Sequence, residues 1–141
     1  WTVMINNPDG RSSLPASFTV GTAGQSMVTV GSVAIKEDLI PLGRDNRPGL
    51  LLEPTYITIH ETDNTAVGAN AAMHAAYIKT DAAAARPASW HFTVDDAEVY
   101  QHLPLNEVAW HAGDGVSGPG NRRSLAVEPD ACFSLARRRH E

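Results

Sequence analysis

The chain has few residues that could crosslink it. It contains one cysteine, Cys132, among 141 residues, so no disulfide can form within the chain. It has no CxxC pattern, no HExxH pattern and no pair of histidines four residues apart, which are the local patterns that identify many zinc sites. Any metal ligands must therefore come together from distant segments.

Long apolar runs are also missing. No stretch approaches the roughly 18 to 20 apolar residues that a membrane-spanning helix needs. The first twenty residues, Trp1 to Val20, lack a basic region followed by an apolar block, so they do not resemble an export signal. The sequence predicts no membrane partner and shows no signal peptide.

Basic residues are in the minority, with 11 Lys and Arg against 16 Asp and Glu and a net charge of −5. They form no stripe with interleaved aromatic residues, so nucleic acid is not an expected partner. The basic run Arg137 to Arg139 is interpreted as a solvated tail.

The remaining composition is that of a folded domain. Hydrophobic residues make up 43% and charged residues 19%, and 141 residues suffice for one core. Residues 1–33 are rich in Gly, Ser, Thr, Pro and Asn and are predicted to form a linker or loose N-terminal arm, with a possible turn at Asn7 to Gly10. Residues 34–141 are predicted to form the folded domain.

Alternating and alanine-rich segments predict the first elements of that domain. The β-branched run Tyr56 to His60 predicts a strand that places Tyr56, Thr58 and His60 on one face. Ala66 to Lys79 predicts a helix, with an N-cap among Asp63 to Thr65. The alanine-rich composition continues to Pro87, which ends any helix.

The second half of the domain predicts strands and a loop. Ser89 to Val94 and Glu98 to Leu103 predict a β-hairpin. The glycine-rich stretch Gly113 to Gly120 predicts a surface loop. Ser124 to Glu128 predicts a short buried strand, and Pro129 is expected to end its pairing. This order of elements predicts a mixed α/β domain.

Two side chains at strand ends are candidates for chemistry. His60 closes its strand ahead of a polar stretch, which suits either a metal or catalytic histidine or a hydrogen-bonded histidine at the rim of the core. Glu128 ends an apolar strand, where burial would raise its pKa toward the range of a general base. A capping or ion-paired glutamate is the alternative.

Four segments together resemble the amidase_2 family of N-acetylmuramoyl-L-alanine amidases, which is related to phage lysins and peptidoglycan recognition proteins. They are Lys36 to Gly49, Tyr56 to His60, Ser89 to Asp96 and Trp110 to Glu128, so the resemblance covers residues 34–128. It implies an α/β fold with a central mixed β-sheet flanked by helices. It also implies a peptidoglycan hydrolase that cleaves the amide bond between N-acetylmuramic acid and L-alanine by zinc-activated water.

The resemblance also implies roles for individual residues. His60 matches the family's first zinc ligand, and Glu128 matches its catalytic glutamate, which acts as general base on the zinc-bound water. Trp110, His111 and Asp114 are expected to line the substrate groove. Bacterial peptidoglycan is the implied partner, so a secreted or cell wall-associated protein is expected, and a monomer.

The chain departs from the family after Glu128. The family continues with a helix and a late motif that holds further zinc ligands, whereas residues 129–141 do not resemble that continuation. Neither Cys132 nor His140 lies at the matching distance, although these two or His111 could substitute as ligands. A non-catalytic peptidoglycan-binding module or an inactive truncated amidase is therefore the alternative, and residues 1–26 and 129–141 could be foreign to the amidase sequence.

Overall fold

A computed structural model describes residues 2–3, 16–17, 29–30 and 33–130. The chain divides into two compact units, Trp1–Ile35 and Lys36–Glu141. Within the first unit β1 (Thr2–Val3) pairs with β2 (Ala16–Ser17), and β3 (Thr29–Val30) pairs with the start of β4 (Val33–Glu37), both antiparallel.

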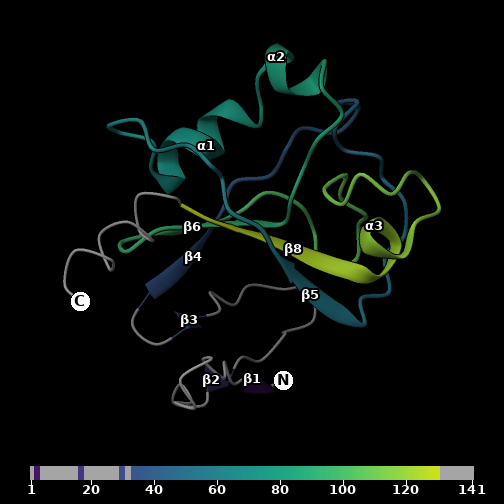
Figure 1. Ribbon diagram of the computed structural model, residues 1–141, viewed down its shortest axis with the longest axis horizontal. Helices are drawn as coiled ribbons and strands as arrows, with labels where there is room; N and C mark the ends of the chain where they lie inside the picture. The colour runs from purple at the N-terminus through teal and green to yellow at the C-terminus, as the bar shows by residue number, and fades with distance from the viewer. Residues whose placement is uncertain (1, 4–15, 18–28, 31–32, 131–141) are drawn as a thin grey trace. The chain divides into compact units, whose positions relative to one another are not determined.

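The second unit is built on a mixed sheet with the strand order β4-β7-β6-β8-β5 (Figure 1). Its other strands are β5 (Tyr56–Ile59), β6 (Phe92–Val94), β7 (Val99–Gln101) and β8 (Ser124–Pro129). β8 lies between β5 and β6 and runs parallel to both, whereas β6 and β7 are antiparallel. With its helices, this sheet confirms the predicted α/β class.

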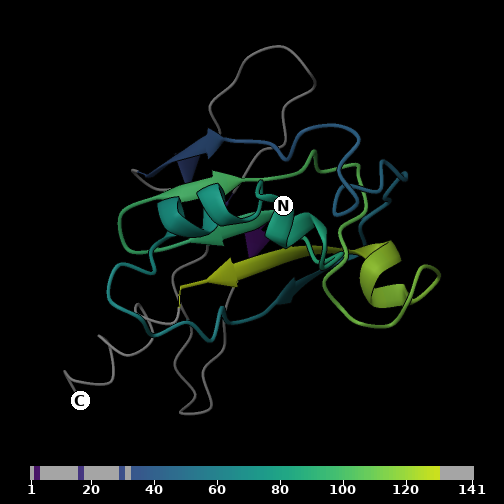
Figure 2. The same cartoon turned by 90° about the horizontal axis from the view of Figure 1, so that it is seen from above.

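Helices α1 (Ala71–Tyr77) and α2 (Asp81–Ala84) follow β5 along the chain. Figure 2 shows α1 lying across the hairpin strands β6 and β7, which it contacts. The predicted helix start at Ala66 is wrong. Gly68 has a φ of +86°, outside the right-handed helical region, and Asn70 provides the N-cap by accepting a hydrogen bond from the Met73 amide.

The predicted hairpin is confirmed, although both strands are shorter than expected. Ser89 lies outside β6 because its amide and hydroxyl bond to the backbone of Trp110 instead. Pro129 does not stop the pairing of β8. Its carbonyl accepts a hydrogen bond from the Thr62 amide, and the amide of the next residue, Asp130, donates to the Val94 carbonyl. Because proline has no N–H, the strand lacks only the one hydrogen bond that this group would donate.

The glycine-rich loop is confirmed up to Gly118, but its end is helical. Helix α3 (Pro119–Arg123) begins with a proline at its first position, which suits a helix start. A Cβ atom added at Gly118 would lie 2.1 Å from the Asp114 side chain, and one at Gly120 would lie 2.4 Å from the Ala112 side chain. These two glycines are therefore required by close packing.

The apolar core lies beneath the hairpin and α1. Ile40, Ile78, Leu103 and Ala109 are fully buried and pack together, with Trp90 against them. An ion pair between Arg47 and Glu107 closes one side of this cluster, at 2.7 Å between Nη2 and Oε1.

Some predicted features fall outside the described residues. They are the turn at Asn7 to Gly10, the solvated tail at Arg137 to Arg139, and Cys132 and His140 as substitute ligands. The linker assignment for residues 1–33 and the divergent tail at 129–141 remain predictions. Within residues 2–3, 16–17, 29–30 and 33–130, no helix is long and apolar enough to span a membrane.

Candidate active site

Strands β5 and β8 carry their polar side chains on one face. Tyr56 is paired with Ser124 and Thr58 with Ala126, so His60 follows beside Glu128. The His60 amide donates to the Val127 carbonyl at 2.9 Å, which keeps this register past the end of β5. Since neighbouring strands lie about 4.8 Å apart, His60 and Glu128 are adjacent although they are distant in sequence.

His60 contacts a second imidazole. Its Nε2 atom lies 2.9 Å from Nδ1 of His111, and the two rings meet edge to face with an interplanar angle of 69°. Burial lowers the pKa of His111, and the positive charge that His60 can carry lowers it further. The His111 ring therefore stays neutral more readily than a lone exposed histidine.

The other nitrogen of His111 is anchored to buried Ser124. His111 Nε2 lies 3.2 Å from Ser124 Oγ, and that hydroxyl donates to the Gly120 carbonyl at 2.7 Å. Thr58 donates to the same Ser124 oxygen at 2.8 Å. A single buried hydroxyl thus links β5, β8, α3 and the His111 ring.

The loop that carries His111 is held by two polar side chains. Asn121 accepts hydrogen bonds from the amides of His111 and Ala112, both at 2.9 Å, and donates to the Gly115 carbonyl. Asp114 accepts from the amides of Gly120 and Asn121 at the start of α3. Both carboxylate oxygens of Asp114 are therefore engaged in holding the loop.

Glu128 occupies an environment that favours its protonated form. Burial raises its pKa from 4.5 to about 7, and no described residue forms an ion pair or hydrogen bond with its side chain. A carboxyl group with a pKa near the working pH can both accept and return a proton. Among the described residues, no hydrogen bond or ion pair supports the capping or ion-pairing alternatives for Glu128.

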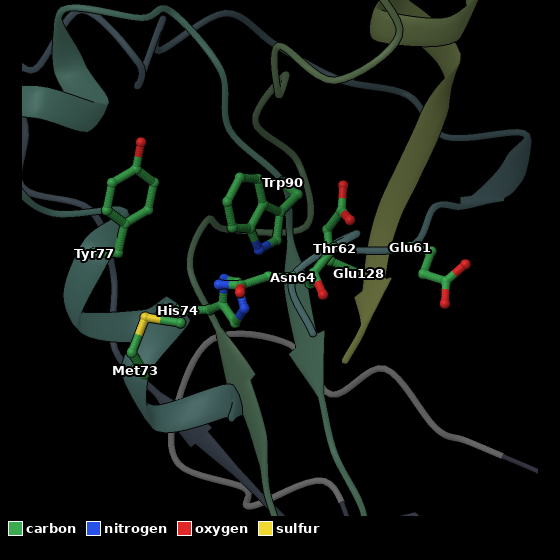
Figure 3. A pocket seen from close by; sticks show the side chains of 8 residues that line it. All are labelled: Glu61, Thr62, Asn64, Met73, His74, Tyr77, Trp90 and Glu128. Atoms are coloured by element: carbon green, nitrogen blue, oxygen red, sulfur yellow. The ribbon is translucent and has the colours of Figure 1, made fainter. Parts of the chain in front are cut away.

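An open pocket of about 380 Å³ lies between Glu128 and α1. In Figure 3 Met73, His74 and Tyr77 extend from α1, with Trp90 and Glu128 across the pocket. Its volume is in the range of small-molecule sites. The remaining lining residues are Glu61, Thr62 and Asn64.

His74 is the least accessible side chain of this pocket. It is 7% exposed, and its Nε2 atom is buried without a hydrogen-bond partner. Burial lowers its pKa, so the ring is neutral in the folded protein at neutral pH. A neutral imidazole suits contact with an uncharged amide or hydroxyl rather than an anion.

The structure brings together only some of the residues that the sequence suggested. His60 lies beside Glu128 and contacts His111. Of the five predicted site residues, only Glu128 lines the pocket, and His60, Trp110, His111 and Asp114 do not. The sequence interpretation missed the side of the pocket that α1 forms with Met73, His74 and Tyr77, which we call the α1 wall, and it missed Trp90. Met73 and Tyr77 are four residues apart on a helix, which is the one signal that could have placed them on a common face.

The described residues do not form a complete metal site. His60 and His111 place two imidazole nitrogens close together, and imidazole is a suitable zinc donor. Zinc sites normally use three or four protein ligands, and no group of three His, Cys, Asp or Glu side chains able to hold a metal exists in the described part of the chain.

Sequence comparison identifies relatives over most of the second unit. Residues 51–137 match the family model Amidase_2, which is described as N-acetylmuramoyl-L-alanine amidase. The matched range extends past Glu128. The chain is 55% identical over 96 residues to the N-acetylmuramoyl-L-alanine amidase CwlH of Bacillus subtilis (strain 168), covering 68% of this chain and 37% of CwlH. It is 59% identical over 96 residues to the amidase XlyA of the same organism, covering 68% of this chain and 31% of XlyA.

Solved structures give the same relatives. The catalytic domain of XlyA matches with a TM-score of 0.66 and 56% identity, over 74% of this chain and 67% of that chain. A mutant endolysin from Bacillus subtilis matches with a TM-score of 0.66 and 55% identity, over 72% of this chain and 64% of that chain. The chain spans about a third of the length of the two curated relatives, at 37% and 31%.

Proposed function

Because the chain belongs to the Amidase_2 family of N-acetylmuramoyl-L-alanine amidases, we propose that it hydrolyses the amide bond between N-acetylmuramic acid and L-alanine in peptidoglycan. The observation that carries this proposal is the half-buried Glu128, with a pKa of about 7, beside His60 and at the edge of an open pocket. Amide hydrolysis needs a group that takes a proton from water and later returns it, and Glu128 has the required proton affinity.

The proposed reaction uses Glu128 twice. Its carboxylate takes a proton from a water molecule while the water oxygen bonds to the carbonyl carbon of the amide. The C–N bond then breaks, and the departing nitrogen of L-alanine takes the proton from Glu128. The pocket beside Glu128 would hold the peptide, with Trp90 and Tyr77 against its apolar parts and His74 against an amide group.

Zinc activation of the water is the finer part of the proposal. The family resemblance implies that His60 is a zinc ligand, and this role is supported by a second imidazole, that of His111, within 2.9 Å. The further ligands would have to come from outside the described residues, since those residues hold no three-ligand group. The support for catalysis therefore comes from Glu128 rather than from a metal site.

Partners and location follow from the substrate. Bacterial peptidoglycan is the proposed partner, and the protein is proposed to act as a monomer, secreted or associated with the cell wall. Trp110, His111 and Asp114 remain proposed groove residues, with Asp114 acting through the loop that it holds.

A binding module that does not cut is the second candidate. The incomplete set of described metal ligands favours it, because a pocket can hold muropeptide without a metal ion. Muropeptide binding with no release of peptide, unchanged by a chelator, would support this candidate over the amidase.

The test of the amidase proposal is release of peptides with free L-alanine amino termini from purified cell walls. Glu128→Gln should lower the rate by about 10²- to 10⁴-fold, the usual contribution of a general acid–base group. The matched control is Glu53→Gln, which changes an exposed glutamate outside the pocket and should leave the rate unchanged. Full activity of a folded Glu128→Gln variant would remove Glu128 as the base.

A chelator separates the zinc part from the rest. Loss of release on chelation and its recovery with added zinc would support the metal in the proposed function. If peptide release survives chelation but is lost in Glu128→Gln, the amidase proposal stands and the proposed role of zinc is wrong.

A further inference from the structure

The indole ring of Trp90 is held by contacts with several parts of the fold. Its Nε1 atom donates a hydrogen bond to Thr93 Oγ1 at 2.7 Å. The ring meets the His102 ring edge to face, with the centroids 6.2 Å apart and an interplanar angle of 90°. Trp90 also packs against the apolar core cluster. The side of the pocket that faces the α1 wall in Figure 3 is therefore formed by a ring whose orientation is fixed.

Thr93 is a rigid anchor for this ring. It is fully buried in β6, and its β-branched side chain has restricted freedom at χ1. Its hydroxyl makes a second contact, 2.8 Å from His102 Nε2. In the sheet Thr93 is paired with Glu128 of the neighbouring strand β8. The anchor of the indole thus lies one strand away from the proposed general base.

The hydrogen bond to Thr93 uses the only polar group of the indole. Tryptophan has a single ring N–H, which donates and does not accept. Because this proton is directed at Thr93 Oγ1, the ring has no hydrogen bond left for a molecule in the pocket. The Trp90 side of the pocket therefore suits apolar groups. The buried Nε2 atom of His74, which has no partner among the described residues, lies on the α1 wall instead.

We propose that Thr93 is a positioning residue whose hydroxyl holds the Trp90 indole, so that the ring presents a carbon surface to apolar groups of the peptide bound beside Glu128. Without the Thr93 oxygen, the indole N–H would lose its partner, and the ring would turn to find another. Thr93 does not line the pocket, so it acts through Trp90. The proposal deepens, and rests on, the peptide-binding role proposed for this pocket.

The first test is kinetic and uses soluble muropeptides prepared from purified cell walls with a muramidase. Thr93→Val keeps the shape of the side chain but removes the oxygen. It should raise KM roughly 3- to 10-fold, the net effect of one hydrogen bond, and change kcat by less than about twofold. Thr93→Ser keeps the hydroxyl and should have the KM of the unmodified chain. Thr55→Val is the matched control, because the exposed Thr55 hydroxyl makes only a 3.4 Å contact with the Arg123 carbonyl.

A second background tests whether Thr93 acts through the indole, even if Thr93→Val alone does not fold. Trp90→Phe keeps an aromatic ring but has no N–H to donate. Adding Thr93→Val to Trp90→Phe should therefore leave KM within about twofold of the Trp90→Phe value. A larger rise in KM would show that Thr93 acts by a route other than the indole, and it would overturn the proposal.

The indole N–H signals in a ¹H–¹⁵N spectrum test the positioning step without substrate. The chain has three tryptophans, and Trp90→Phe identifies the signal of Trp90. Its proton should exchange slowly with water in the unmodified chain and in Thr93→Ser, and faster in Thr93→Val, where the hydrogen bond is lost. Equal exchange rates in all three proteins would mean that Thr93 does not hold the ring.

Binding of the same muropeptides separates this proposal from the proposed function. Muropeptides that bind without being cut, with a Kd raised in Thr93→Val and unchanged in Thr93→Ser, would keep the positioning role and count against the amidase. Peptide release with one KM for the unmodified chain and both Thr93 variants would keep the amidase and overturn the positioning role. A chain that neither binds nor cuts muropeptides would overturn both.

Discussion

The two faces of the β5–β8 strand pair differ in almost every respect. One face carries Thr58, His60, Ser124 and Glu128, and of these His60 and Ser124 contact the His111 ring. The opposite face carries the alternate residues, which are apolar: Ile57, Ile59, Leu125 and Val127.

On these faces a polar side chain is buried and two apolar side chains are exposed, which is the reverse of the usual arrangement. Ser124 is fully buried, whereas Ile57 is 41% exposed and Ile59 is 64% exposed. Apolar side chains usually lie inside and polar ones outside, so these positions depart from the usual arrangement. Exposed apolar side chains on a sheet also indicate a surface that gains stability when covered.

The largest expected effect is acid sensitivity that arises from two buried histidines, His91 and His102. Burial lowers the pKa of both His91 and His102 to about 4, so between pH 6.5 and 4 the unfolded chain binds protons that the native chain does not. Stability therefore falls as pH drops through this window, by about 2 kcal/mol for each histidine at pH 5.

Urea unfolding at pH 7.5 and pH 5 measures this loss. Glu128 acts in the opposite direction, so the loss should be larger in Glu128→Gln than in the unmodified chain. His102→Gln should reduce the loss. A stability that is independent of pH in Glu128→Gln would show that the two histidines are not buried in neutral form.

Ser124→Ala should cost about 1 to 3 kcal/mol, because it leaves the Thr58 hydroxyl, the His111 ring and the Gly120 carbonyl without their shared partner. Denaturant unfolding at pH 7.5 measures the difference. Thr55→Ala is the control, since the exposed Thr55 makes only a 3.4 Å contact with the Arg123 carbonyl. Equal effects of the two changes would mean that the network adds no stability.

Glu128→Gln should raise stability at pH 8. The folded pKa of Glu128 is raised to about 7 from 4.5, so its contribution to stability is complete below 4.5 and is lost as pH rises through 7. Glutamine carries no charge to bury. The gain in midpoint should be clear at pH 8 and shrink at pH 5, and a gain independent of pH would point to a cause other than ionisation.

The smallest effects are expected on the apolar face. Ile57→Thr and Ile59→Thr should each change stability by less than about 0.5 kcal/mol, because exposed positions contribute little burial. Thermal unfolding of each variant measures the change. A loss of about 2 kcal/mol from either variant would show that this face is covered in solution, and the contrast between the faces would then be smaller.

Strands β5 and β8 and the hairpin were predictable from local pattern. Alternation in Tyr56 to His60 and the apolar run Ser124 to Glu128 predicted β5 and β8 to within one residue. The start of α1 was not predictable. Alanine content favours helix from Ala66, but Gly68 in the left-handed region and the Asn70 cap delay it.

Part of the candidate site was predictable from the sequence and part was not. His60 and Glu128 stand at strand ends and matched family motifs, so the sequence singled out both, although their catalytic roles remain proposals. The α1 wall with His74 and the link from Ser124 to His111 could not be predicted. They depend on contacts between segments distant in the chain, which no local pattern records.

The sequence alone therefore predicted strands β5 to β8, apart from their exact ends, and singled out side chains that are able to act on protons or metal ions, because alternation and side-chain chemistry are local properties. Only the tertiary structure decided that Glu128 lies half-buried beside His60, and that Ser124 donates to the Gly120 carbonyl. The pKa of a carboxyl group and the tautomer of an imidazole are set by the groups that surround them. Those groups arrive from separate strands, helices and loops only when the chain has folded.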